Sequence, residues 1–133
     1  MRRRELLNLA GAAAIASPDL VWTNTAYRQK ASTMYGLIGK MTAVAGQRDA
    51  VIAILLGSTG AMPGCLSYVI ATDPADADAL WITEVWDSQA SHKASLSLPA
   101  VQAAIVKAKP LIAGFSNRVE TTPVGGYGLA KVP

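Results

Sequence analysis

The sequence predicts a small α+β domain with strands and helices in the order β-α-β-β-α-β. Four stretches are rich in β-compatible apolar residues and lack a helical period, whereas two stretches carry apolar residues at helical spacing. Gly- and Pro-containing turns separate these stretches. The second and third strand-like stretches follow one another across a short turn, which is typical of a hairpin. This order is that of the ferredoxin-like split motif.

Length and composition fit one globular domain. The chain has 133 residues, of which 51% are hydrophobic and 16% charged, so a disordered polypeptide is excluded. The excess of 12 basic over 9 acidic residues is concentrated in Arg2, Arg3 and Arg4. Without these and Glu5, nine basic residues (twelve minus three) face eight acidic ones (nine minus one). No basic stripe or known motif remains, which argues against a nucleic-acid partner.

The first sixteen residues have the features of a cleavable signal peptide. The arginines precede a modestly apolar stretch, residues 6–16, that ends in the small-x-small triplet Ala14-Ile15-Ala16. Arg3-Arg4-Glu5-Leu6-Leu7 resembles the twin-arginine export motif. These features predict export to the periplasm or the extracellular space. Because the stretch is too short to span a bilayer, we expect no stable membrane anchoring. The alternative is an amphipathic first helix of a cytoplasmic protein.

The elements of the first half follow from local patterns. Residues 17–33 are polar and aperiodic, which predicts a linker or a loosely docked arm. Residues 34–44 read as the first strand, and residues 47–56 carry apolar side chains at i,i+4 spacing, as a helix requires. A Gly- and Pro-containing loop, residues 58–64, precedes the second strand.

Residues 65–72 and 79–86 form the predicted hairpin around an Asp-rich turn. The second of these strands is bulky on both faces, with Leu80, Ile82 and Trp86 on one face and Trp81 and Val85 on the other. Two helices cover only one face of a four-stranded sheet, so a twofold-related copy is the simplest cover for the other face. The sequence therefore predicts a homodimer. In the alternative, the 17–33 arm or the C-terminal tail folds over that face.

A helical region after residue 87 completes the pattern. Asp87 is the expected N-cap, the region is interrupted at Pro99, and Pro110 ends it. Residues 115–122 read as the fourth strand, with Phe115, Asn117 and Val119 on one side. The folded domain is therefore expected at residues 34–122, followed by a flexible Gly- and Pro-rich tail at 123–133.

Three segments resemble the antibiotic biosynthesis monooxygenase family. They are Pro63-Gly64-Cys65-Leu66-Ser67-Tyr68, Ile82-Thr83-Glu84-Val85-Trp86-Asp87-Ser88 and Ala90-Ser91-His92. Their order matches Pro-Gly-x-x-x-Tyr, Glu-x-Trp-x-Ser and a His early in the next helix. The resemblance covers about residues 34–122 and implies a dimeric α+β barrel. It also implies oxygenation of a phenol or hydroquinone to a quinone by O₂, without flavin, haem or metal.

The sequence agrees with the absence of a cofactor. It has no Gly-x-Gly-x-x-Gly after a strand, no phosphate loop and one His. The aspartates of the turn, Asp73, Asp76 and Asp78, lack the other ligands of a calcium loop. Cys65 is the lone cysteine and reads as a small buried hydrophobe.

Without a cofactor the substrate must supply the electrons, and a phenol does so best as its anion. His92 is therefore the candidate base, since histidine is the side chain that ordinarily titrates near neutrality; the alternative is a surface residue beside Lys93. Trp86 is a candidate to stack on an aromatic substrate or, alternatively, a core tryptophan. Tyr68 either bonds a substrate oxygen or fills the core.

Two charged residues complete the candidate site. Glu84 shares a strand face with Trp86, so it is either semi-buried with a raised pKa or paired with Arg118 or Lys40. Arg118 either holds an anionic oxygen of the substrate or forms a salt bridge at the strand edge.

Two other functions fit the same fold. Related dimeric barrels bind and degrade haem, but their Asn in the first strand and their His late in the second helix are missing, since residues 101–109 contain no His. The other alternative is a non-catalytic, small-ligand-binding or stress-associated dimer.

Overall fold

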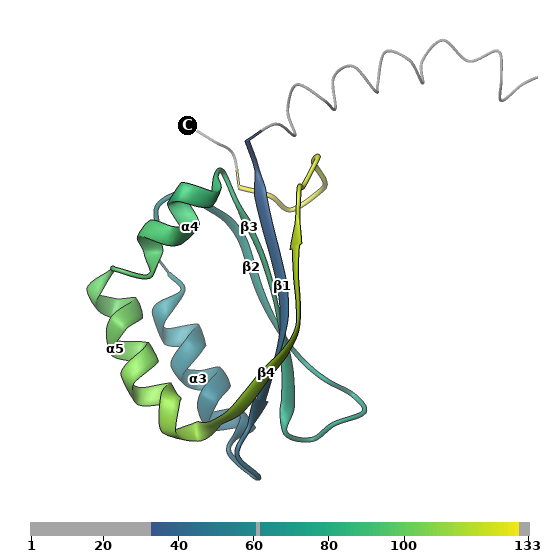
Figure 1. Ribbon diagram of the computed structural model, residues 1–133, viewed down its shortest axis with the longest axis vertical. Helices are drawn as coiled ribbons and strands as arrows, with labels where there is room; N and C mark the ends of the chain where they lie inside the picture. Colours follow the sequence, from purple (N-terminus) through teal and green to yellow (C-terminus); the bar gives the residue numbers. More distant parts are fainter. Residues whose placement is uncertain (1–32, 61, 131–133) are drawn as a thin grey trace, which may run out of the picture.

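The protein is an antiparallel sheet with helices packed against one face (Figure 1). The computed structural model describes residues 33–60 and 62–130; the predicted signal peptide and nearly all of the predicted arm lie outside them. The strands pair in the order β2-β3-β1-β4, which confirms the predicted ferredoxin-like motif. They are β1 (Tyr35–Ala43), β2 (Cys65–Thr72), β3 (Ala79–Trp86) and β4 (Ile112–Thr121).

The helices fill the two crossovers. They are α3 (Arg48–Ser58), α4 (Gln89–Ser95), α5 (Pro99–Ala108) and the 3₁₀ turn η1 (Lys109–Leu111). The break predicted at Pro99 is confirmed, because this proline stands in the first turn of α5, where its missing N–H costs nothing. None of the helices within the described ranges is long and apolar enough to cross a membrane.

The N-terminus of α4 differs from the prediction. Ser88, not Asp87, is the N-cap, and its Oγ accepts a hydrogen bond from the Ser91 N–H at 3.1 Å. Asp87 instead turns back toward Gly64, whose carbonyl accepts its N–H at 2.8 Å. A β carbon on Gly64 would lie 2.6 Å from Asp87 Oδ1 and 2.5 Å from Ser91 Oγ. The glycine of the Pro-Gly segment is therefore what lets the start of β2 approach α4.

A bulge in β4 corrects the predicted alternation of that strand. Asn117 has a φ of 52°, and the pairing of β1 with β4 shifts register there. Phe115 stands opposite Met41 before the bulge, and Val119 stands opposite Ile38 after it. Phe115 therefore lies on the helix side of the sheet and Val119 on the other side, although both were expected on one face.

The core lies between the sheet and the helices. Its buried centre consists of Met41, Ala43, Val51 and Leu80. Partly buried apolar residues from α3, η1 and the sheet surround it, and Trp86, at the end of β3, is fully buried. Burial of these side chains supplies the main driving force for folding.

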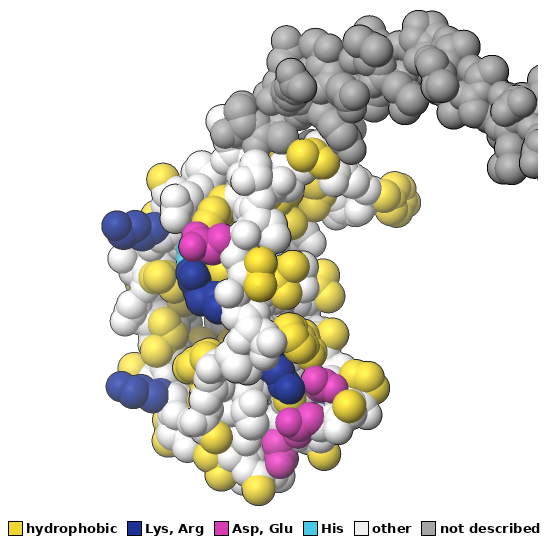
Figure 2. Space-filling model, turned by 45° about the vertical axis from the view of Figure 1, so that its right-hand side comes forward, with side chains coloured by type: hydrophobic (Ala, Val, Ile, Leu, Met, Phe, Trp, Pro, Cys, Tyr) yellow, Lys and Arg dark blue, Asp and Glu magenta, His cyan; other side chains and the backbone are white. Residues whose placement is uncertain are grey.

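No helix formed by residues 33–60 or 62–130 packs on the opposite face of the sheet. The strand registers place Ile38, Trp81 and Val85 there, with Val69 and Val119 about half exposed. Figure 2, which brings this side forward, shows several hydrophobic side chains on it, with basic and acidic side chains among them. The Trp81 Nε1–H donates to Asp73 Oδ2 at 3.0 Å. The prediction that β3 is bulky on both faces is therefore confirmed.

Candidate active site

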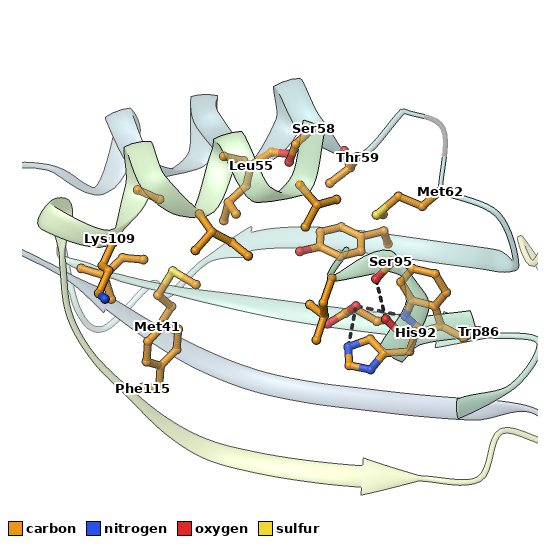
Figure 3. A pocket seen from close by; sticks show the side chains of 18 residues that line it. Met41, Leu55, Ser58, Thr59, Met62, Trp86, His92, Ser95, Lys109 and Phe115 are labelled. Atoms are coloured by element: carbon orange, nitrogen blue, oxygen red, sulfur yellow. Dashed lines mark hydrogen bonds and ion pairs between the residues drawn. The ribbon is translucent and has the colours of Figure 1, made fainter. Parts of the chain in front are cut away.

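A cavity of about 450 Å³ lies between the helices and the sheet (Figure 3). Apolar side chains from β1, α3, α5 and β4 make most of its wall, among them Met41, Leu55, Val101, Ala104, Ile105 and Phe115. Polar side chains are few, and four of the five predicted site residues are among the lining residues: Tyr68, Glu84, Trp86 and His92. Such a concave, largely apolar space with a few polar groups is typical of small-molecule sites.

The pairing of β2 with β3 brings the first three of these residues together. Tyr68 stands opposite Glu84 across the two strands. Trp86 follows Glu84 by two residues and therefore shares its face. The capped first turn of α4 then places His92 above this corner of the sheet.

The carboxylate of Glu84 is the polar centre of the site. Its Oε1 accepts the Trp86 Nε1–H at 3.0 Å and lies 3.9 Å from His92 Nε2. Only 12% of the side chain is exposed, and this burial raises the pKa of Glu84 above its usual value. The predicted semi-buried carboxylate with a raised pKa is confirmed. Lys40 pairs with Asp73 instead, at 3.6 Å.

The imidazole of His92 is held between two aromatic rings. The ring centroid of Tyr35 lies 5.3 Å away in a tilted arrangement, and that of Trp86 lies 5.5 Å away with its ring edge-on. Only 16% of the side chain is exposed. His92 therefore faces the cavity, and the alternative of a surface residue beside Lys93 is wrong.

Tyr35 is a neighbour of the site that the sequence did not reveal. It is buried, and its hydroxyl donates to Glu120 Oε2 at 2.7 Å. Burial, followed by the Glu120 hydrogen bond, raises the pKa of Tyr35, so it stays a neutral phenol. Its only sequence signal is an aromatic residue at the start of a strand; the β1–β3 register is what sets it opposite Trp86.

Arg118 is the one candidate that lies outside the cavity wall. Its side chain is 60% exposed, and its Nη1 lies 3.5 Å from Glu120 Oε1. The structure thus shows the salt bridge at the strand edge that the sequence left as an alternative.

Trp86 and Tyr68 have different surroundings. Trp86 is fully buried and anchors Glu84, so it acts as wall and hydrogen-bond donor. The Tyr68 hydroxyl makes no hydrogen bond with any residue that the structure describes. Burial, and then the charge of Glu84, raises the pKa of Tyr68. A neutral phenol with an unused O–H is suited to donate to a ligand oxygen.

Burial raises the pKa of Cys65, whose Sγ lies 3.6 Å from the Ser67 carbonyl, which agrees with its reading as a small hydrophobe rather than a nucleophile. Among residues 33–60 and 62–130, no group of three or more His, Cys, Asp or Glu side chains could hold a metal ion.

The fold and the cavity define a ferredoxin-like α+β protein with a small-molecule pocket. Residues 34–107 match the family described as antibiotic biosynthesis monooxygenase, and this is more than half of the chain. The chain therefore belongs to that family, with a monooxygenase-like function on a small molecule in general terms.

Solved structures agree with this assignment. A Chloroflexus aurantiacus protein, described as an antibiotic biosynthesis monooxygenase, is 65% identical, with a TM-score of 0.72 over 74% of this chain and 100% of that chain. A Caulobacter crescentus structure with a similar description is 16% identical, with a TM-score of 0.64 over 74% of this chain and 96% of that one. The latter likeness shows the fold alone. No curated protein matches the chain.

Proposed function

We propose that the protein is a cofactor-independent monooxygenase that uses O₂ to convert a phenol or hydroquinone to a quinone. One observation carries the proposal: His92, Glu84 and Tyr68 meet in a largely apolar cavity. The apolar wall suits an aromatic ring and limits water around it. The Tyr68 hydroxyl is placed to donate to a substrate oxygen.

His92 is the group placed to remove the phenolic proton. Its protonation creates a positive charge 3.9 Å from Glu84 Oε1, which favours the ionised form of that carboxylate. Glu84 is itself fixed by the Trp86 N–H, so the imidazole and its partner are oriented before the substrate binds.

The phenolate then supplies the electrons for the reduction of O₂. With a phenol, one oxygen atom forms a new bond to a ring carbon, which becomes the second quinone carbonyl, and the other leaves as water with two hydrogens, one from the hydroxyl and one from that ring carbon. With a hydroquinone, the new oxygen is a third ring oxygen and the product is a hydroxyquinone. Of the three hydrogens on the two hydroxyls and that ring carbon, two then leave in the water and one remains on the product hydroxyl. The reaction balances without a further reductant.

The proposal extends to location and assembly. The protein is exported through its twin-arginine signal and works as a homodimer whose sheets cover one another's apolar faces. N-terminal sequencing of exported and precursor forms tests the first point, and an exported protein that retains Met1 would contradict it.

Quinone formation from a panel of phenols and hydroquinones under air tests the activity. We expect one ¹⁸O atom from ¹⁸O₂ in each product and stoichiometric O₂ uptake. His92→Ala should lower kcat/KM by roughly 10²- to 10⁴-fold, the usual effect of losing a general base. Lys93→Ala, at the exposed next residue, is the matched control. Tight binding of these compounds without O₂ uptake would instead support the non-catalytic ligand-binding protein.

A further inference from the structure

We infer that the cavity takes an elongated phenol or hydroquinone with an anionic group at the end remote from the reacting ring, and that Lys109 binds this group. The inference rests on the proposed function for the choice of reacting end. The role of Lys109 is tested by binding alone.

The cavity is longer than a single benzene ring. Its lining residues on α5 run from Val101 to Ala108, a rise of roughly 10 Å at 1.5 Å per residue. On the sheet, Glu84 stands opposite Leu37, and Met41 lies four residues further along β1, or roughly 13 Å. Both Glu84 and Met41 line the cavity, so it extends along the strands by about that length.

Lys109 marks the end of the cavity opposite His92. Figure 3 shows Lys109, Met41 and Phe115 at one end and His92, Trp86 and Ser95 at the other. Phe115 is 73% exposed, which shows that the Lys109 end opens to solvent.

The charges of the cavity favour one orientation of such a ligand. Within the described residues, Lys40 and Arg118 each have a carboxylate partner, whereas Lys109 forms no ion pair. Glu84 is the acidic side chain of the cavity wall, so a permanently charged anionic group is disfavoured at the His92 end, whereas the phenolate formed there is balanced by the proton that His92 takes up. The apolar residues between offer an anion no hydrogen bonds. An anionic group is therefore accommodated at Lys109, where it stays hydrated, while the ring reaches His92.

Calorimetric titration without O₂ measures the preference directly. The probes are a 4-hydroxyphenyl alkanoic acid with a chain spanning roughly 10 Å and its uncharged primary amide. We expect the wild-type protein to bind the acid about two- to fivefold more tightly, as an exposed ion pair allows, with the advantage falling as salt increases. Lys109→Gln should abolish the preference and Lys109→Glu should reverse it.

The matched control is Lys107→Gln, on α5 but outside the cavity wall, which should keep the preference. Equal affinity of the wild type for acid and amide would overturn the inference, as would a preference that survives Lys109→Gln. The two proposals fail separately. If the acid binds preferentially but is never oxidised, the result contradicts the monooxygenase proposal and supports the role of Lys109. If both probes are oxidised but bind with equal affinity, the result supports the monooxygenase and contradicts the role of Lys109.

Discussion

The Glu84 carboxylate loses most of its contact with water on folding and gains an N–H from Trp86. Burial raises its pKa above the usual 4.5, so the folded state binds more protons than the unfolded state between these two values. Stability from this group is complete below the unfolded pKa and is lost as pH rises through the folded pKa.

Glu84→Gln removes this dependence while keeping an oxygen that can accept the Trp86 N–H. We therefore expect the Tm of the variant, relative to that of the wild type, to increase as pH rises from about 4 to about 7. Calorimetry across this range measures the difference. Glu120→Gln is the opposite control, because the Tyr35 hydrogen bond lowers the pKa of Glu120. The Tm of this variant, relative to that of the wild type, should therefore decrease with rising pH. Parallel curves for wild type and Glu84→Gln would contradict the account.

Tyr35 acts in this scheme as a positioning residue for His92. Tyr35→Phe keeps the ring beside the imidazole but loses the bond to Glu120, which should cost about 1 kcal/mol of stability and little activity. Tyr35→Leu removes the ring, so kcat should fall more than KM changes. Steady-state kinetics separate the two variants. Equal kinetics for Phe and Leu would show that the ring does not orient His92.

The sequence predicted the residues on the cavity wall better than the neighbouring residues that orient them. Tyr68, Glu84, Trp86 and His92 lie within short motifs, and local alternation places them on one face. Tyr35 is far from His92 along the chain, and their contact depends on a strand register that local patterns do not encode.

At the level of elements, the approach of β2 to α4 depends on Gly64. Its φ of 83° disfavours any side chain, and a β carbon would also collide with Ser91 and Asp87. Gly64→Ala should therefore cost about 2 kcal/mol or more in chemical denaturation. Gly46→Ala is the matched control, since its φ is 80° but its surroundings are open, so only the conformational cost of about 1 kcal/mol remains. Equal losses would show that the contact with α4 has no energetic role.

Element boundaries were predictable where the signal is local. β2 and β3 begin and end where alternation and turn residues predicted, and Pro99 opens α5 as expected. The bulge at Asn117 was missed because it exists only in the pairing of β4 with β1. Asp87 is a suitable N-cap by residue type. In the structure, however, its N–H donates to the Gly64 carbonyl, and Ser88 is the N-cap.

For the whole molecule, the uncovered sheet face predicts association of two copies. Val119→Glu places a charge on this face and should convert a micromolar dimer to monomer, measured by light scattering after size exclusion. Val106→Glu is the control, because Val106 is 72% exposed on α5, away from the sheet, and should leave the mass unchanged. A monomeric wild type at micromolar concentration would contradict the dimer.

The prediction of a partner rests on β3, because its large side chains alternate to both sides and the described helices pack on one side only. The path of the residues after β4 could not be predicted from local patterns. The Ala130 N–H donates to the Leu66 carbonyl of β2, so these residues return to the far edge of the sheet.

That return contact has a consequence for aggregation. Unprotected edge strands invite pairing with further copies and lead to open-ended ribbons. Here Ala130 occupies a backbone acceptor of β2, and the Asn117 bulge twists β4 out of regular pairing geometry. Both borders of the sheet are thus poor templates for strand addition. We therefore expect self-association to use the broad face, where two copies would close on one another and growth would stop.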